Sequence, residues 1–367
     1  MTTSETWHFP PDLRGTFAPE GLTSRQADEA LACAWEYVRT IVPAYTDRAR
    51  YIALARLTAI STVTEFRGEH ISPLASPVIA GYDTGELLAT LFAGTAVHET
   101  MAREYYSSIL ITAEKSSPHG NAELLSRYTA AIAHSPAQWF RIRDCDAQAR
   151  LFIAASLACN DIQDAWLTEE QNQILTEICD AMYDAMAYHK HRAEGEICNT
   201  FAYAHPGLRQ STYRTYRETL WNIDAHWADT PERTPVVNFL RNIAGPIHMM
   251  MRRYRFVEDS LTIGNPETAH TVDQARKNVK LWYRLRPTPQ NNNHYQDILA
   301  SQDRVLFPGF AAILENAGQT CPDCEYPSQY TPSPAQFAGV RVCTAHQKEF
   351  DTHLAELPGR ARRVLGL

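Results

Sequence analysis

The sequence predicts an all-α fold, and three observations lead to that prediction. Apolar residues recur three and four positions apart over most of the chain, which is the spacing of one helix face. Helix-start signals recur between these segments, whereas strand signals are almost absent, with residues 339–342 as the one short candidate. The chain has 367 residues, 44% of them hydrophobic, which is enough material for a large core.

Local signals place the elements in order along the chain. Residues 1–22 contain three Pro and two Gly and predict an extended lead-in. Helical spacing begins at about Thr23 and continues, with breaks, to about residue 317. Thr168 and Gln171 spell a capping box before a long helix that we expect to reach about Lys190. Three further starts show a capping residue followed by Pro: Ser135-Pro136, Thr230-Pro231 and Asn265-Pro266.

Glu65 and Glu69 stand at the end of an apolar helical segment. They are four residues apart, so both carboxylates project from one helix face. Carboxylate oxygens are ligands that Mg²⁺ prefers, and the pair is therefore a candidate magnesium site. A solvated helix end is the alternative reading of the same pattern.

A second acidic group follows the apolar segment 151–159. Asp161 and Asp164 are three residues apart and share a face. Their spacing is close to the aspartate-rich motif of class I terpene synthases, with Asn160 in place of its first Asp. This group predicts a Mg²⁺ site, and an N-cap cluster for the following helix is the alternative.

Residues 188–196 hold the densest group of chemically capable side chains. The group contains Tyr188, His191, Arg192, Glu194 and Glu196. It favours a carboxylate site for Mg²⁺ in which the arginine faces a phosphate. A His–carboxylate site for a transition metal and a solvated charged segment remain alternatives.

Two arginine groups are candidates for anion binding. Arg252 and Arg253 lie among Met and aromatic residues, and Arg141 and Arg143 follow Trp139 and Phe140. Guanidinium groups suit bidentate contacts with phosphate. At least one arginine of each group is expected to be structural and to pair with a nearby carboxylate: Asp144, Asp146 or Glu258.

Three of the eight cysteines cluster near the end of the chain. Cys321 and Cys324, followed by Cys343 and His346, have the spacing of a treble-clef or ribbon-like zinc knuckle. Four ligands with no open position predict a structural Zn²⁺ site. A disulfide between the first two cysteines is the alternative, which a reducing cytosol disfavours. The other five cysteines fall in apolar helical segments and predict small core residues.

The charge balance limits the class of partner. With 34 Lys and Arg against 42 Asp and Glu, the net charge is −8, which argues against non-specific nucleic-acid binding. An anionic small molecule remains compatible, because a divalent metal can bridge it to an acidic protein. The sequence shows no apolar run long enough for a membrane span and no secretory signal, so we expect a cytoplasmic protein. It does not predict the oligomeric state.

Several segments together resemble one known family. The longest reads Gly-Pro-Ile-His-Met-Met-Met-Arg-Arg-Tyr-Arg-Phe-Val-Glu at 245–258, and others are Glu-Phe-Arg-Gly-Glu at 65–69 and His-Arg-Ala-Glu-Gly-Glu at 191–196. Further matching segments are residues 6–7, 10–12, 32–37, 101–105, 158–161 and 200–203. They resemble the fungal α-ionylideneethane synthases of abscisic acid biosynthesis, a group of sesquiterpene synthases. The terminal cysteines also fit, although His346 stands where the family pattern suggests Cys.

The resemblance implies an architecture and a reaction. The expected fold is a terpene-synthase-like helical bundle around an apolar pocket, with an extended lead-in (1–22), a helical catalytic domain (23–317) and a zinc-binding segment with a C-terminal helix (318–367). The implied substrate is farnesyl diphosphate, and the implied product is (2Z,4E)-α-ionylideneethane or a related sesquiterpene. The implied route comprises Mg²⁺-assisted loss of diphosphate, loss of a proton to a neutral triene, reprotonation and ring closure, so an acid/base group is required.

Residue roles follow from the matching motifs. Arg192, Arg252 and Arg253 are expected to hold diphosphate. The residues themselves, rather than the family, suggest Tyr188, His191 and Glu258 for proton transfer. A same-fold synthase with another product and a non-enzymatic zinc-knuckle scaffold protein are the alternative functions. The expected Mg²⁺ ligands are Glu65, Glu69, Asp161, Glu194 and Glu196, with Asp164 and His191 as weaker candidates.

Overall fold

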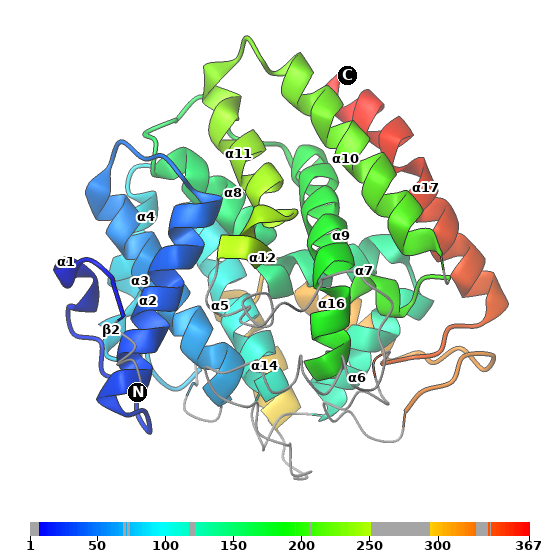
Figure 1. Ribbon diagram of the computed structural model, residues 1–367. Helices are drawn as coiled ribbons and strands as arrows, with labels where there is room; N and C mark the ends of the chain where they lie inside the picture. Colours follow the sequence, from blue (N-terminus) through cyan, green and yellow to red (C-terminus); the bar gives the residue numbers. More distant parts are fainter. Residues whose placement is uncertain are drawn as a thin grey trace, which may run out of the picture.

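The computed structural model describes residues 7–68, 71, 74–116, 122–194, 196–205, 207–250, 294–327, 337 and 339–367. Most of these residues are helical, which confirms the all-α prediction (Figure 1). None of the described helices combines the length and the apolar character that a membrane crossing requires.

The first part of the chain runs from blue to blue-green in Figure 1, and its blue N-terminal segments lie at one side of the molecule. Its two short strands, β1 (Val78–Ile79) and β2 (Tyr82–Asp83), form an antiparallel hairpin. Its helices are α1 (Pro11–Arg14), α2 (Ser24–Ile41), α3 (Arg48–Arg67), α4 (Thr84–Phe92), α5 (His98–Ser116), α6 (Ala122–Ala130), α7 (Pro136–Ala147) and α8 (Ala149–Ala158), with the 3₁₀ turn η2 (Ala131–Ala133).

The second half begins with the longest helix, α9 (Glu169–Glu194), which contacts α7, α8, α10, α11 and α17. The last helix, α17, lies beside α10 at the opposite side from α2 and α3 (Figure 1). The remaining elements are α10 (Leu208–His226), α11 (Thr234–Ile243), α12 (Pro246–Met250), α14 (His294–Ala300), α15 (Gln302–Val305), α16 (Phe310–Ala317) and α17 (Thr344–Leu365), with the 3₁₀ turns η3 (Thr200–Ala202) and η4 (Pro231–Arg233).

The predicted helix starts occur where the capping signals lie. Thr168 and Gln171 form the predicted capping box at the start of α9, through backbone-to-side-chain bonds of 3.1 and 3.2 Å. Ser135 precedes α7, with Pro136 as its first residue. Thr230-Pro231 opens η4, which leads into α11, and Asn265-Pro266 lies outside the described residues.

Two local predictions differ from the structure. The lead-in contains the four-residue helix α1, whose Leu13 is fully buried. The candidate strand at 339–342 contributes only an isolated bridge between Arg341 and Glu325. The hairpin at 78–83 escaped the sequence patterns because two residues per strand are too few to show an alternation. Its turn needs positive φ at Ala80 and Gly81, at 51° and 85°, and a side chain at Gly81 would meet the backbone of the lead-in.

Helix α9 carries an unusual polar stripe into the core. Glu177, Asp180, Asp184 and His191 are spaced three, four and seven residues apart, so they share one helix face. All four are buried. Because burial of a charge is costly without a partner, we expect the neighbouring helices to place polar or charged groups against this stripe.

Candidate functional site

An internal cavity lies against the polar stripe of α9. Its volume is about 120 Å³, and it is bordered by residues of α2, α3, α5, α7, α8, α9 and α11. Its charged lining consists of four acids and two cations: Glu65, Asp146, Asp180, Glu196, Lys115 and Arg143.

The uncharged part of the cavity lining is rich in aromatic side chains. Tyr37 and Phe152 have ring centroids 5.3 Å apart, and Phe152 stacks on Phe239 at 6.2 Å. The two phenylalanines are almost fully buried. Such a wall excludes water and presents π faces that stabilise a positive charge. The cavity therefore combines an acidic lining with an apolar, aromatic one.

Close packing at the end of α3 positions Glu65. Gly68 is the C-cap of this helix and lies against the backbone of Ala113 in α5, so close that a Cβ atom would overlap it. The crossing therefore depends on glycine. It brings Glu65 to the same cavity as Lys115, two residues after Ala113.

The two cations of the cavity are held by buried carboxylates. Arg143 donates to both oxygens of Asp184, at 3.1 and 2.7 Å, and to Asp146 at 3.3 Å. Burial lowers the pKa of Arg143, but the charge of Asp184 and the other nearby acidic groups raise it well above its usual value. The ammonium nitrogen of Lys115 lies 2.6 Å from Asp146 and 3.7 Å from Glu196. Both cations are thus fixed beside the cavity.

Asp180 stands apart from this network. Its side chain is fully buried, and neither carboxyl oxygen has a hydrogen-bond partner within the described residues. Burial raises the pKa of Asp180 well above its usual value; Arg143 opposes the shift, and Asp144, Asp184 and Asp146 add to it. Burial in this position therefore favours the protonated form of the carboxyl group over the charged form.

His191 is oriented by Asn199. The amide oxygen of Asn199 accepts from the backbone N–H of Phe201 at 2.9 Å, which fixes the amide so that its nitrogen faces Nδ1 of His191, also at 2.9 Å. Because an amide nitrogen only donates, Nδ1 accepts, and the ring proton of the neutral imidazole lies on Nε2. The imidazole is buried and belongs to the cavity lining.

The structure brings three of the predicted site residues together. Glu65, His191 and Glu196 all line the cavity. Glu196 also accepts the backbone N–H of Cys198 at 3.1 Å. Glu194 is the last residue of α9. Glu69, Arg252, Arg253 and Glu258 lie outside the described residues.

Two other predicted residues do not line this cavity. Tyr188 packs edge-on against Phe337, with ring centroids 5.1 Å apart, and the guanidinium of Arg209 lies 4.1 Å from its ring. Arg192 is exposed to solvent. The predicted roles of these two side chains in proton transfer and diphosphate binding gain no support from the cavity.

Asp161 and Asp164 lie in the turn after α8 and are exposed. Asp161 has a positive φ of 56°, accepts from the hydroxyl of Thr46 at 2.7 Å, and lies 3.5 Å from the guanidinium of Arg50. Neither aspartate lines the cavity. The structure does not bring them to Glu65, so their predicted role as Mg²⁺ ligands gains no support. The N-cap alternative does not describe them either, since Thr168 caps α9.

Sequence reasoning missed Asp180, Asp184 and Lys115. A signal existed for the two aspartates, which are four residues apart in an otherwise apolar helical segment. At least one arginine of the group at 141–143 was expected to pair with a nearby carboxylate such as Asp144 or Asp146, and Arg143 does pair with Asp146. No sequence pattern marks Lys115, and its position at the cavity follows from the crossing of α3 and α5.

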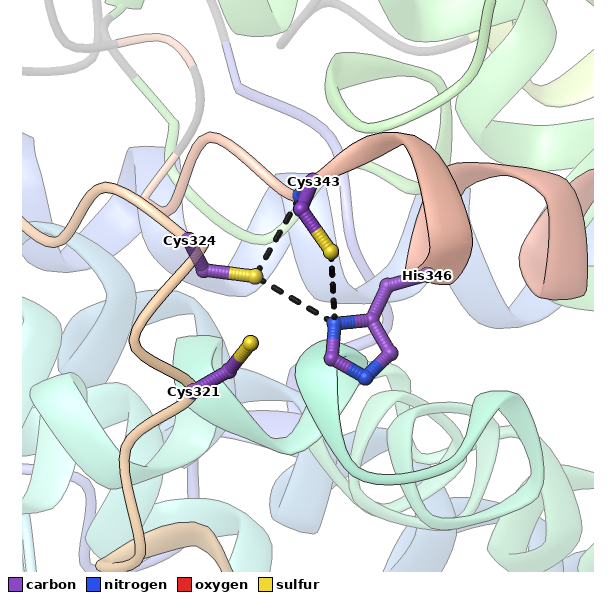
Figure 2. A group of neighbouring side chains, drawn as sticks. All are labelled: Cys321, Cys324, Cys343 and His346. Atoms are coloured by element: carbon purple, nitrogen blue, oxygen red, sulfur yellow. Dashed lines mark hydrogen bonds between the residues drawn. The ribbon is translucent and has the colours of Figure 1, made fainter.

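The predicted terminal cluster is assembled. Cys321 and Cys324 lie in the segment before α17, Cys343 is its N-cap, and His346 is in its first turn. Figure 2 shows all four side chains directed toward a common centre. Their ligand atoms lie within 4.8 Å of one another, and Nδ1 of His346 is 3.3 and 3.4 Å from the sulfurs of Cys324 and Cys343. All three cysteines are free thiols, so the disulfide alternative is wrong.

The donor set of this cluster suits a metal ion. Backbone N–H groups at the start of α17 lower the pKa of the Cys343 thiol, while burial raises that of Cys324 to about 11. Three sulfurs and one imidazole nitrogen form a closed tetrahedral set. Within the described part of the chain, no other group of three or more His, Cys, Asp or Glu residues has its ligand atoms this close together.

Comparison with known proteins connects the fold to a family. The family model described as "Alpha-ionylideneethane synthase aba3" matches residues 5–367. The chain belongs to the α-ionylideneethane synthase family. The family resemblance seen in the sequence is thereby confirmed.

Curated members of the α-ionylideneethane synthase family align with most of the chain. "Alpha-ionylideneethane synthase aba3" from Botryotinia fuckeliana (strain B05.10) is 46% identical over 98% of this chain and 83% of its own length. A second aba3 sequence from Botryotinia fuckeliana is 49% identical over 88% of this chain and 78% of its own. "Alpha-ionylideneethane synthase abl3" from Leptosphaeria maculans is 46% identical over 97% and 84%.

Proposed function

We propose that the protein is a sesquiterpene synthase that converts farnesyl diphosphate to (2Z,4E)-α-ionylideneethane or a closely related hydrocarbon. Membership of the α-ionylideneethane synthase family supports this proposal. The structural observation that carries it is the cavity, which joins acidic and cationic side chains to a buried aromatic wall. Cleavage of an allylic diphosphate needs both a polar site for the leaving group and a dry site for the carbocation.

The acids of the cavity fit a divalent cation. The lining holds two more acids than cations. Glu65 and Glu196 would hold Mg²⁺, together with Glu69 and Glu194, which are four and two residues away from them in the sequence. Bound Mg²⁺ neutralises diphosphate and helps it leave.

The remaining lining residues bind and protect the substrate. Lys115 and Arg143 supply fixed positive charge toward the diphosphate. Tyr37, Phe152 and Phe239 cover the hydrocarbon chain, exclude water and stabilise positive charge on carbon. The shape of this wall determines which cyclised product forms.

Incubation with farnesyl diphosphate and Mg²⁺, followed by gas chromatography–mass spectrometry and a diphosphate assay, tests the proposal. The expected product is an α-ionylideneethane-type hydrocarbon. Absence of both hydrocarbon and released diphosphate would contradict it, and a different hydrocarbon would favour the alternative of a same-fold synthase.

Two matched variants locate the metal site. Glu65→Gln removes a cavity carboxylate and should reduce diphosphate release by about 100-fold or more, since metal-assisted charge neutralisation is worth several kcal/mol. Asp161→Asn changes an exposed carboxylate outside the cavity and should retain activity. The reverse result would move the Mg²⁺ site to the turn after α8. A non-enzymatic scaffold protein would show no activity to lose.

For the terminal cluster, we propose a structural Zn²⁺ ion bound by Cys321, Cys324, Cys343 and His346. The four donors close the site and leave no position for a substrate. The ion would join the segment before α17 to the first turn of that helix.

A further inference from the structure

Most buried acids among the described residues accept hydrogen bonds, whereas Asp180, which lines the cavity, accepts none. Within the described residues, no other carboxyl group has both oxygens buried without a hydrogen-bond partner. The contrast is clearest against six buried acids that accept hydrogen bonds from donors or cations: Glu104, Asp144, Asp146, Glu177, Asp184 and Glu196.

The surroundings of Asp180 favour its neutral form without making ionisation impossible. From α7, Arg143 attracts its negative charge, whereas Asp144 and Asp146 repel it. From its own helix, Asp184 repels it as well. The other charged or titratable groups that line the cavity are Tyr37 of α2, Glu65 of α3, Lys115 of α5, Cys179, Tyr183 and His191 of α9, and Glu196.

We propose that Asp180 is the acid that protonates the neutral polyene during cyclisation and the base that recovers a proton afterwards. This inference rests on the proposed function, which requires such a group. Asp180 lies on the wall of the cavity where the hydrocarbon would bind, and no described donor occupies either oxygen. His191 is less suited, because its Nδ1 is already engaged by Asn199.

The protonation and the final deprotonation balance on this single residue, and the proton lost earlier, when the first carbocation becomes the neutral triene, passes to the released diphosphate. In the first step, the O–H bond of Asp180 breaks, and an electron pair of the polyene π system forms the new C–H bond. This leaves a carbocation in the polyene and a carboxylate on Asp180, which the nearby Arg143 stabilises. After ring closure, the carboxylate takes a proton from a carbon beside the cation, and the C–H electron pair becomes the final double bond. Asp180 is again a neutral acid, and no other reagent is consumed.

The test is Asp180→Asn, which replaces a neutral carboxylic acid by a neutral amide of the same shape. With farnesyl diphosphate and Mg²⁺, the variant should still release diphosphate but accumulate the uncyclised triene. Cyclised product should fall by about 100-fold or more, the usual contribution of a general acid. Asp180→Glu keeps the acid and should restore part of the cyclised product. The ratio of triene to cyclised product is a readout that a merely structural role would not move.

Each other outcome contradicts the inference in a recognisable way. Loss of diphosphate release together with an altered Mg²⁺ requirement would make Asp180 a metal ligand instead. An unchanged product ratio would leave it no role in proton transfer. Failure of the Asn variant to fold would show that the carboxylate form is structural, because the amide removes no hydrogen bond within the described residues. If the wild type releases no diphosphate at all, the proposed function fails rather than the role of Asp180.

A labelling experiment examines the same step in the unaltered protein. The enzyme is equilibrated in deuterium oxide and mixed with less than one equivalent of farnesyl diphosphate, so that each molecule turns over once. If Asp180 supplies the proton, the cyclised product carries one deuterium from the exchanged acid. Product without deuterium would exclude an exchangeable donor, Asp180 included.

Discussion

Buried polar side chains in this protein differ mainly in how the cost of their burial is offset. Arg143 and Asp184 share two hydrogen bonds, so each charge compensates the other. Asp180 accepts no hydrogen bond within the described residues, and its burial raises its pKa and favours the neutral form. His248 is almost fully buried, and burial together with the charge of Lys190 lowers its pKa to about 3.

His248 should make the protein sensitive to acid. Its pKa is near 6.5 in the unfolded chain and about 3 in the folded state, so the unfolded state binds more protons between these values. The contribution of His248 to the free energy of unfolding is therefore fully present above pH 6.5. It falls by about 1.4 kcal/mol per pH unit as the pH decreases toward 3. Urea unfolding from pH 7 to pH 5 should show a smaller loss for His248→Leu than for the wild type. Equal losses would contradict a neutral, buried imidazole.

The sequence could predict part of the cavity at this scale. Glu65 and Glu196 belong to dense acidic motifs, and such motifs are visible without a structure. Asp180 is hidden in an apolar helical segment, and its chemistry arises from what faces it. Only the packing of α7 on α9 shows that Arg143 forms hydrogen bonds with Asp184 and none with Asp180.

At the scale of helices, α9 is held in place by the C-terminal helix. Glu177 is buried in α9 and accepts from Arg360 at 2.9 and 2.7 Å, from His353 at 2.9 Å and from the hydroxyl of Tyr216 at 2.8 Å. Burial alone would raise the pKa of Glu177, but its bonds with His353 and Arg360 lower it below the usual value. Glu177 precedes Asp180 by one helical turn, so this contact also positions the cavity wall.

Removal of Arg360 should destabilise the protein strongly. Arg360→Met leaves a buried carboxylate with its bidentate partner missing, which costs about 3 to 5 kcal/mol when a buried pair is broken. As a control, Arg341→Met breaks an exposed pair with Glu325, whose side chains are 82% and 76% exposed, and should cost less than about 1 kcal/mol. Chemical denaturation measures both. Equal small effects would show that α17 does not secure α9.

The zinc proposal also belongs to this scale. The purified protein should contain one Zn²⁺ per chain by elemental analysis, and Cys343→Ser should lose most of it. A strong chelator should lower the melting temperature and loosen α17, because binding free energy at such a site contributes to folding. Cys33→Ser, which changes a buried cysteine outside the cluster, should keep its metal. A protein with no bound metal and no response to the chelator would contradict the proposal.

Short-range signals explain why the helices and the cluster were predictable. The capping box at Thr168 and the spacing from Cys321 to Cys324 act within a few residues. The hairpin at residues 78–83 depends instead on contacts with the distant lead-in, where Ala18 donates to the carbonyl of Ala80 at 2.9 Å. Its conformation could not be inferred from its own residues.

At the scale of the whole molecule, the net charge of −8 can be assigned in part to one region of the structure. Part of the excess acid lines one cavity, where it opposes an anionic ligand unless a cation accompanies it. Mg²⁺ and inorganic diphosphate should therefore stabilise the protein together far more than either does alone. A ligand at 100 times its dissociation constant adds about 2.7 kcal/mol, which thermal unfolding detects readily.

Glu65→Gln is the matched variant for this experiment and should reduce the joint effect of Mg²⁺ and diphosphate. Asp161→Asn should leave it intact, because that carboxylate is exposed and lies outside the cavity. Additive shifts from Mg²⁺ and diphosphate in the wild type would indicate separate sites rather than one shared site.

The contact between Glu177 and α17 has a consequence for biosynthesis. During translation, α9 leaves the ribosome long before His353 and Arg360 are made. Before His353 and Arg360 are made, Glu177 either remains hydrated or is buried as an uncompensated charge, which is unfavourable. The nascent chain should therefore keep α9 undocked, and the wall that carries Asp180 should close only after α17 has emerged. Synthesis itself thus delays assembly of a reactive cavity until the chain is almost finished.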